Sequence, residues 1–411
     1  MGLLTMPLTP SLRRPSNTVI LLFASAVSVV LVFQVWLING PNIAALPAGH
    51  FIPGGRHANI NDINNATLGF EKIYVIGLPA RTDRRDGIVL SAALSNMSIE
   101  LIDGVLGETI SDKAIPSAEG YKRMPDPVLG CWRGHMNTIQ EMVRLNIQTA
   151  LILEDDADWD VRIRDQLRDF ALSVHALTQP LSEDPSSYAD STFPSPKSPG
   201  ALPASELSFN DLPSTIPPKG SPYGDNWDFL WVGHCGMRLP SKSVKNGAKI
   251  PKGRVVHHDD PTVPQKQFLW TVSSVDDLKD GYEDHTRVVS HVQDGICSLG
   301  YAITQAGARK LLHSIGLLNV DAAYDLLLRQ YCEGSHGRPY HNCLAPIPSL
   351  FHHHRPAGSI QAESDISDHG DGYKKTAHTD VVRWSTRMNW DVLLDGKTNW
   401  KDQFPDAKQK A

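Results

Sequence analysis

Three adjacent carboxylates, Glu154, Asp155 and Asp156, directly follow a short apolar run at residues 149–153. Hard cations such as Mg²⁺ and Mn²⁺ prefer oxygen ligands, often one or two carboxylates completed by substrate phosphates. Successive side chains on an extended backbone point in opposite directions, so at most two of the three converge on one ion. We predict Asp156 as the direct metal ligand. Glu154 and Asp155 either share the ion, bind it through water, or contact the ribose and sugar of the bound phosphate compound. The alternative is a solvated acidic turn, which the apolar run before it disfavours.

Three arginines, Arg81, Arg84 and Arg85, follow another apolar run at residues 73–78. Guanidinium groups bind phosphate and carboxylate oxygens through paired hydrogen bonds. We therefore predict that these arginines bind the phosphates of a ligand shared with the acidic cluster. The alternative is an exposed helix start whose arginines pair with neighbouring aspartates.

A histidine run, residues 352–354, follows a Pro-containing apolar segment, and its middle member His353 is the candidate for a third metal ligand. Neutral imidazole is a tolerable ligand for Mn²⁺. A histidine cluster in a surface loop is the alternative. Asp321 and Asp325 lie one helical turn apart and are candidates for a general base, as is Asp294. For Asp321 and Asp325 the alternative is a helix cap followed by a solvated carboxylate.

The elements that must position these residues alternate between strand and helix. This pattern predicts an α/β sheet with crossover helices, in which ligands bind at the carboxyl ends of the strands. Both charged clusters lie at such strand ends. The predicted strands are residues 73–78, 98–101, 149–153, 227–233 and 299–304, and the predicted helices include residues 129–146, 162–177 and 305–315.

Residues 18–38 form a long run without any charged side chain. About 20 apolar residues suffice for a helix to cross a bilayer. Because Arg13 and Arg14 precede the run, we predict a cytosolic tail at residues 1–17, a retained anchor at 18–38 and a lumenal remainder, which places the chain in the Golgi or ER membrane. A long cleaved signal is the alternative.

The rest of the chain divides by composition. Residues 39–70 contain no periodicity and are predicted to be a stem. Residues 71–375 are predicted to form the catalytic domain, with less regular insertions at 179–224 and 239–290. The tryptophan-containing stretch 376–411 is predicted to pack onto that domain.

Charge and cysteine content narrow the possible partners. The formal net charge of −6 gives no general electrostatic reason to bind nucleic acid. The five cysteines form no CxxC pair and no zinc-type spacing, and disulfides are possible in an oxidising compartment. Cys332 and Cys343 are the pair closest in sequence, although spacing alone does not settle the connectivity.

Several sequence blocks resemble glycosyltransferase family 25, which includes bacterial lipooligosaccharide and animal collagen galactosyltransferases. The blocks occur in order at residues 74–88, 102–108, 129–140, 150–159, 227–236, 297–312, 320–325 and 348–367. The resemblance implies an α/β, GT-A-like and Rossmann-related nucleotide-sugar-binding fold, here preceded by one transmembrane helix. It also implies Mn²⁺ or Mg²⁺ as cofactor and a UDP-sugar as donor. By position, it places Arg81, Arg84 and Arg85 in the donor loop and Glu154 and Asp156 in the metal motif. His135 matches a family block in which it either faces the site or is a core histidine.

We therefore expect a metal-dependent transferase that moves a hexose, with galactose favoured, from a UDP-sugar to a glycan, glycoprotein or glycolipid acceptor in the secretory pathway. Two alternatives use the same residues differently. One is a phosphohydrolase that cleaves nucleotide sugars with water as acceptor, and the other is an inactive sugar-binding relative.

Overall fold

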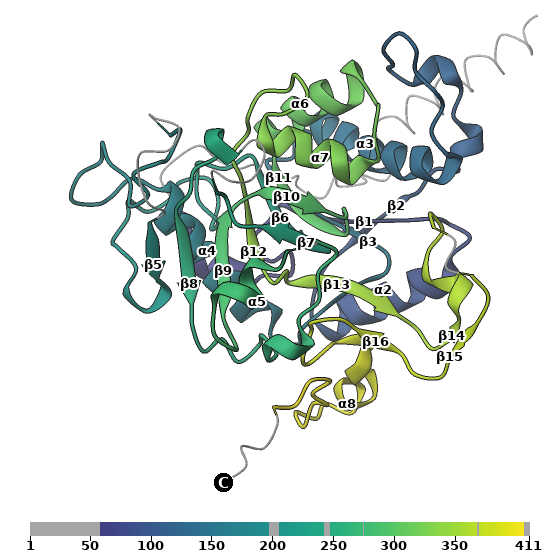
Figure 1. Ribbon diagram of the computed structural model, residues 1–411. Coiled ribbons are helices and arrows are strands. Elements are labelled where there is room, and N and C mark those ends of the chain that lie inside the picture. The colour runs from purple at the N-terminus through teal and green to yellow at the C-terminus, as the bar shows by residue number, and fades with distance from the viewer. Residues whose placement is uncertain (1–57, 197–204, 242–246, 274, 368–369, 407–411) are drawn as a thin grey trace, which may run out of the picture. The chain divides into compact units, whose positions relative to one another are not determined.

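The computed structural model describes residues 58–196, 205–241, 247–273, 275–367 and 370–406 (Figure 1). These residues belong to one compact unit. Among the described residues, no helix combines the length and the apolar character needed to cross a bilayer. This finding corrects the predicted transmembrane helix and the membrane localisation drawn from it. The segment 18–38 on which that prediction depended lies outside the described residues.

A mixed sheet of nine strands forms the centre of the unit. β1 runs parallel to both β2 and β3, so their carboxyl ends meet at one edge of the sheet, whereas β11 runs antiparallel to β3 and β6. This mixed α/β architecture is compatible with the expected GT-A-like fold. The strand order is β2 (Glu100–Asp103), β1 (Lys72–Gly77), β3 (Thr149–Glu154), β11 (Gly300–Thr304), β6 (Phe229–Gly233), β12 (Cys343–Ile347), β9 (Arg287–His291), β8 (Arg254–His257) and β5 (Glu206–Ser208).

Alternating side chains of β1 divide the apolar core between the two faces of this sheet. Ile73 and Val75 join one buried cluster, and Tyr74 and Ile76 join the other. The first cluster lies under α2 (Thr82–Leu94) and α4 (Ile163–Thr178). The second lies under α3 (Asp126–Leu145), α6 (Gln305–Leu311), the π-helical turn Leu312–Leu318 and α7 (Tyr324–Glu333). Figure 1 shows α3, α6 and α7 together on one side of the strands.

A small three-stranded sheet brings the histidine run beside the acidic strand end. Its order is β16 (His378–Thr379), β13 (Phe351–Arg355) and β4 (Ala157–Trp159). His353 is paired with Ala157 across the β13–β4 ladder, and the His354 amide donates to the Asp156 carbonyl at 2.8 Å. Chain segments almost 200 residues apart in sequence are thereby held together at one end of β3.

The two irregular stretches supply strands to the far side of the large sheet. β5 comes from the stretch 179–224, β8 comes from 239–290, and β9 begins in that second stretch and ends at His291. Besides short 3-10 turns, the remaining described elements are β7 (Gly236–Arg238), which pairs with β10 (Gln293–Ile296), the short β14 (Gly358–Ser359) and β15 (Tyr373–Lys374), and the helices α5 (Asp277–Gly281) and α8 (Trp390–Leu394).

Two disulfides cross-link the fold. Cys332 is bonded to Cys343, the pair closest in sequence, and Cys235 is bonded to Cys297 over 62 residues. Cys131 remains a free thiol.

Candidate active site

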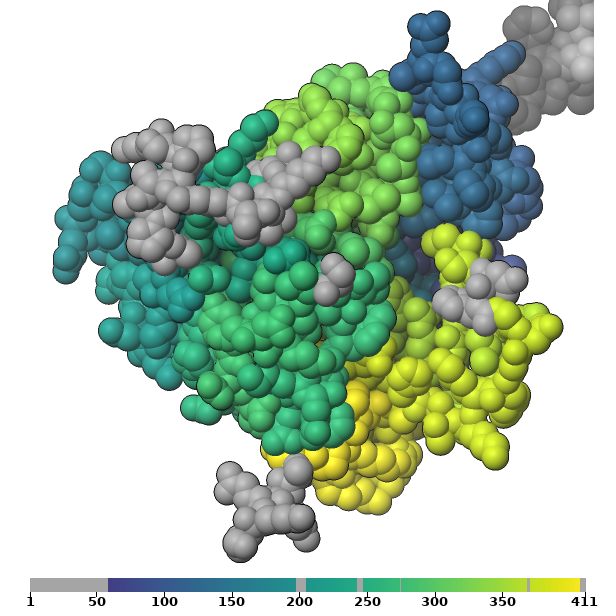
Figure 2. Space-filling view, in the orientation of Figure 1, coloured from purple at the N-terminus to yellow at the C-terminus, as the bar shows by residue number. Residues whose placement is uncertain are grey.

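A cavity of about 230 Å³ opens where β1, β2 and β3 end. Its polar floor carries the acidic cluster, and its other walls include Leu78, Val105 and Leu106 together with the segment 363–366. In Figure 2 the blue segment after β2 and the yellow-green segment before β15 meet at the surface on the right of the view. The cavity therefore combines charged and apolar walls at the strand ends, where α/β sheets bind their ligands.

Three side chains converge on the cavity floor. One potential ligand atom each from Glu154, Asp156 and His353 lies within 4.8 Å of the others, and all three residues line the cavity. The Asp156 Oδ1 atom is buried and has no hydrogen-bond partner. An unpaired buried carboxylate oxygen is costly, and a cation is a partner that removes the cost. The donor set of two carboxylates and one imidazole fits Mn²⁺ or a similar divalent ion.

Electrostatics keep the two carboxylates of this cluster ionised. Burial works to raise the pKa of Glu154, but the hydrogen bond from His135 together with nearby positive charge leaves the pKa lowered. Burial likewise opposes ionisation of Asp156, but positive charge at His353, which a bound cation would supply in place of a ring proton, and the charge of Arg84 overcome it, so the pKa of Asp156 is lowered too. A carboxylate in its charged form is the form that coordinates metal.

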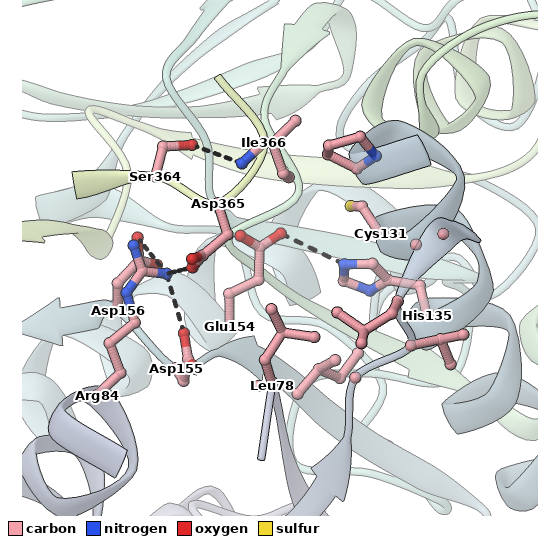
Figure 3. A pocket seen from close by; sticks show the side chains of 18 of the residues that line it. Leu78, Arg84, Cys131, His135, Glu154, Asp155, Asp156, Ser364, Asp365 and Ile366 are labelled. Atoms are coloured by element: carbon pink, nitrogen blue, oxygen red, sulfur yellow. Dashed lines mark hydrogen bonds and ion pairs between the residues drawn. The ribbon is translucent and has the colours of Figure 1, made fainter. Parts of the chain in front are cut away.

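Arg84 links the floor to the segment above it, as Figure 3 shows. Its Nη1 atom lies 3.2 Å from Asp155 Oδ1, 3.5 Å from Asp156 Oδ2 and 3.6 Å from Asp365 Oδ2. Asp155 is buried beside Asp156, and these two effects raise its pKa to about 7 despite Arg84. The Arg84 side chain is thus the nearest compensating charge for the acidic cluster.

The other two predicted arginines lie at the edge of the site. Arg81 pairs with Asp365 at 2.5 Å and with its neighbour Asp83 at 2.9 Å. Arg85 donates to the Gly77 carbonyl at 2.9 Å and pairs with Asp103 at the end of β2. Neither lines the cavity, whereas Arg84 does.

His135 on α3 connects the floor to buried tyrosines. Its Nε2 atom lies 3.3 Å from Glu154 Oε1, and its Nδ1 atom lies 3.0 Å from the Tyr301 hydroxyl. Tyr301 in turn hydrogen-bonds to the Tyr324 hydroxyl at 2.9 Å. When Nε2 carries the proton, His135 donates to Glu154 and accepts from Tyr301, which orients the carboxylate for a cation.

The predicted general bases lie away from the cavity lining. Asp321 precedes α7, because that helix begins only at Tyr324, and it accepts from Asn319 at 2.8 Å. Asp294 pairs with Arg329. Asp325 accepts a hydrogen bond at 2.9 Å from the Cys297 backbone N–H. The structure therefore groups the predicted metal ligands but does not bring these three aspartates to them.

Residues outside the sequence-based prediction complete the site. Asp365 lines the cavity, and Ser298 donates to Glu154 Oε1 at 2.7 Å. Arg355 lies 3.8 Å from Asp156 Oδ2, and the buried Arg387 donates to the Asp155 carbonyl at 2.8 Å. Asp365, Ser298 and Arg355 all fall within the family-like blocks, which was the available signal. Nothing in the sequence indicated Arg387, since it reaches the site only through tertiary packing.

The comparisons with known proteins concern the part of the chain that builds this floor. Residues 70–184 match the model of Glycosyltransferase family 25 (LPS biosynthesis protein). Residues 70–184 are therefore similar to glycosyltransferase family 25. They include β1, α2, α3 and β3, and the family resemblance is thereby confirmed over this stretch.

Curated relatives include proteins named as galactosyltransferases and proteins named as inactive. The chain is 32% identical over 108 residues to a "Glycosyltransferase 25 family member" of Anopheles gambiae, covering 24% of this chain and 18% of that protein. It is 26% identical over 121 residues to "Procollagen galactosyltransferase 1" of Danio rerio, covering 26% and 20%. It is 25% identical over 146 residues to "Inactive glycosyltransferase 25 family member 3" of Homo sapiens, covering 33% and 24%. The chain thus spans less than a quarter of the length of each of these relatives.

Proposed function

We propose that this protein is a metal-dependent glycosyltransferase that transfers a hexose, with galactose favoured, from a UDP-sugar to a hydroxyl of a glycan, glycoprotein or glycolipid. The observation that carries the proposal is the convergence of Glu154, Asp156 and His353 on one cavity, with an unpartnered buried oxygen on Asp156. The family 25 segment and the galactosyltransferase names of relatives support the choice of reaction and sugar.

Each part of the cavity has a role in this proposal. Glu154, Asp156 and His353 hold the divalent cation, for which Mn²⁺ suits the mixed oxygen and nitrogen donors. A cation bound there would neutralise charge on the departing diphosphate as a Lewis acid. Arg84 binds diphosphate oxygens through its guanidinium fork. The apolar wall at Leu78 contacts the nucleoside and keeps water from the reacting carbon.

In the transfer step, the acceptor oxygen forms a bond to the anomeric carbon of the sugar. The bond between that carbon and the diphosphate oxygen breaks, and its electron pair leaves with the diphosphate. We assign the hydroxyl proton to the Asp365 carboxylate. Its side chain lines the cavity and is 35% exposed, whereas the Asp155 side chain is only 6% exposed. An acceptor can therefore reach Asp365 but not Asp155.

The direct test is Asp156→Asn, which keeps the side-chain volume and removes the charge. Wild-type protein with Mn²⁺ should release UDP from a UDP-hexose when acceptors are added, and chelation should stop the release reversibly. Asp156→Asn should lower turnover by at least about 100-fold, since a lost ligand costs several kcal/mol of charge stabilisation. Asp395→Asn is the matched control, because Asp395 is a surface carboxylate paired with Lys397. Normal turnover in Asp156→Asn would contradict the assignment.

An inactive sugar-binding protein is the second candidate, since some relatives are named as inactive. The same screen separates the two functions. Donor binding by calorimetry without UDP release, across a panel of saccharide and glycoprotein acceptors, would favour the inactive form. UDP release that does not depend on any acceptor would instead indicate hydrolysis.

A further inference from the structure

The disulfide between Cys235 and Cys297 lies directly beside the proposed metal site. Cys235 follows β6, and its Sγ atom is 3.8 Å from His353 Nδ1. His353 Nδ1 can donate weakly to this sulfur, and the lone pair of the other ring nitrogen is then available to a cation. The bonded sulfur therefore helps to fix the orientation of the imidazole.

The other half of the disulfide reaches a second proposed ligand. Cys297 is followed at once by Ser298, whose hydroxyl donates to Glu154 Oε1 at 2.7 Å. The Cys297 backbone is itself fixed on both sides, because its N–H donates to Asp325 Oδ2 at 2.9 Å and its carbonyl accepts from Trp231 Nε1 at 2.9 Å. Asp325 thus holds the cysteine in place from α7.

Cys297 also needs these partners, because its backbone has a φ of 68°. Few non-glycine residues adopt this left-handed conformation without support from their surroundings. The covalent bond to Cys235 and the two hydrogen bonds supply that support. Loss of the bond would let residue 297 relax and move Ser298 away from Glu154.

We propose that the Cys235–Cys297 disulfide is a positioning element of the cation site, so that divalent-cation affinity depends on this bond. The inference rests on the proposed metal-dependent function and deepens it. The bond acts on His353 through Cys235 and on Glu154 through Cys297 and Ser298. The bonded form of this pair is therefore the form that positions the site for Mn²⁺.

The experiment compares two double variants by Mn²⁺ titration calorimetry, without any sugar donor. Cys235→Ala with Cys297→Ala should weaken Mn²⁺ binding by about tenfold or more, the range found when partners of metal ligands are removed. Cys332→Ala with Cys343→Ala is the matched control, since it removes the other disulfide and should leave the affinity within about twofold of wild type. Circular dichroism at the titration temperature confirms that each protein is folded. Equal affinity in wild type and the Cys235/Cys297 variant overturns the proposal.

A single substitution tests the same link with both disulfides intact. Ser298→Ala removes only the hydroxyl that holds Glu154 and should also weaken Mn²⁺ binding by about tenfold. Unchanged affinity in Ser298→Ala overturns the Glu154 half of the proposal even where the double variant fails to fold.

Failure of the inference and failure of the proposed function give different results. If wild-type protein binds no Mn²⁺, the cation site itself is wrong and both proposals are overturned. If wild type binds Mn²⁺, Asp156→Asn does not, and the Cys235/Cys297 variant binds like wild type, then only the positioning role is overturned.

Discussion

At the scale of single residues, the site depends on buried polar groups whose partners are specific. The Tyr301 hydroxyl contacts His135 Nδ1, and the other nitrogen of that histidine contacts Glu154. Removing a buried hydroxyl that is hydrogen-bonded to two buried groups costs more free energy of unfolding than removing a hydroxyl that has no partner. Tyr74 offers the comparison, because its hydroxyl is buried on the same face of the sheet without a hydrogen-bond partner.

We predict that Tyr301→Phe lowers Mn²⁺ affinity by about tenfold, because the substitution frees the His135 ring that orients Glu154. It should also lower the free energy of unfolding by about 1 to 3 kcal/mol, since His135 Nδ1 loses its buried partner. Tyr74→Phe is the control: it should leave the Mn²⁺ affinity unchanged and should not lower the free energy of unfolding, because it removes a buried hydroxyl that has no partner. Calorimetric titration and urea unfolding measure the two effects. Equal behaviour of the two variants would show that the Tyr301 hydroxyl does not support the site.

At the scale of elements, α3 must approach the segment after β2 very closely. A Cβ atom on Gly130 would lie 2.4 Å from the Val105 carbonyl oxygen, well inside contact distance. In a free helix, alanine is more favourable than glycine by about 1 kcal/mol. Here the clash is with backbone, which cannot move aside as a flexible side chain does. Alanine at this position should therefore destabilise the protein instead of stabilising the helix.

Gly130→Ala should therefore lower the melting temperature and displace α3 from the cavity wall that Gly130 and Val105 form. We expect donor binding to fall by at least about tenfold, since a shift of about 1 Å at a site is costly. Gly281→Ala is the control, because a Cβ atom there meets nothing within 4 Å. Thermal unfolding and donor titration check both variants. A more stable Gly130→Ala protein would contradict the close approach.

The elements that build the floor were predictable from the sequence, and those that complete it were not. The run at residues 149–153 is apolar and ends in acids, and it forms β3 as predicted. By contrast, β13 is the sequence Phe-His-His-His-Arg, which has no apolar alternation, and the buried His354 is accommodated through Thr379 at 3.0 Å. Such strands depend on partners distant in sequence. β9 was not predicted for the same reason, because its buried Arg287 depends on an ion pair with Asp260 at 2.7 Å.

Helix boundaries limited the prediction of the site as well. Asp321 and Asp325 were placed on one helical face from their spacing, but α7 begins after Asp321. The predicted pair therefore does not share a helix face. The metal ligands were less sensitive to such errors, because a carboxylate at the end of a buried strand lies at the sheet edge even when a boundary moves by a residue.

At the scale of the described unit, the large sheet extends far beyond the site, and a buried neutral histidine lies in its distant part. His291 ends β9 with no exposed surface, and its ring stacks on Phe193 of the stretch 179–224 at 5.7 Å. Burial lowers the pKa of His291 to about 4, although the charge of Asp190 opposes this. His234 is buried beside the site, and burial lowers its pKa to about 4 as well.

Acid should therefore destabilise the folded protein through His291. Its pKa is lower in the folded than in the unfolded chain, so the unfolded chain binds the proton first and stability is lost as the pH falls from about 6.5 towards 4. Between pH 7 and pH 5 this single group should cost about 2 kcal/mol of unfolding free energy.

His291→Phe keeps a ring against Phe193 and cannot be protonated, so this variant should lose about 2 kcal/mol less unfolding free energy than wild type between pH 7 and pH 5. His313→Phe replaces an exposed histidine and should lose as much as wild type. Urea unfolding at both pH values measures the difference, and a parallel decline in wild type and His291→Phe would show that His291 is not buried as a neutral ring.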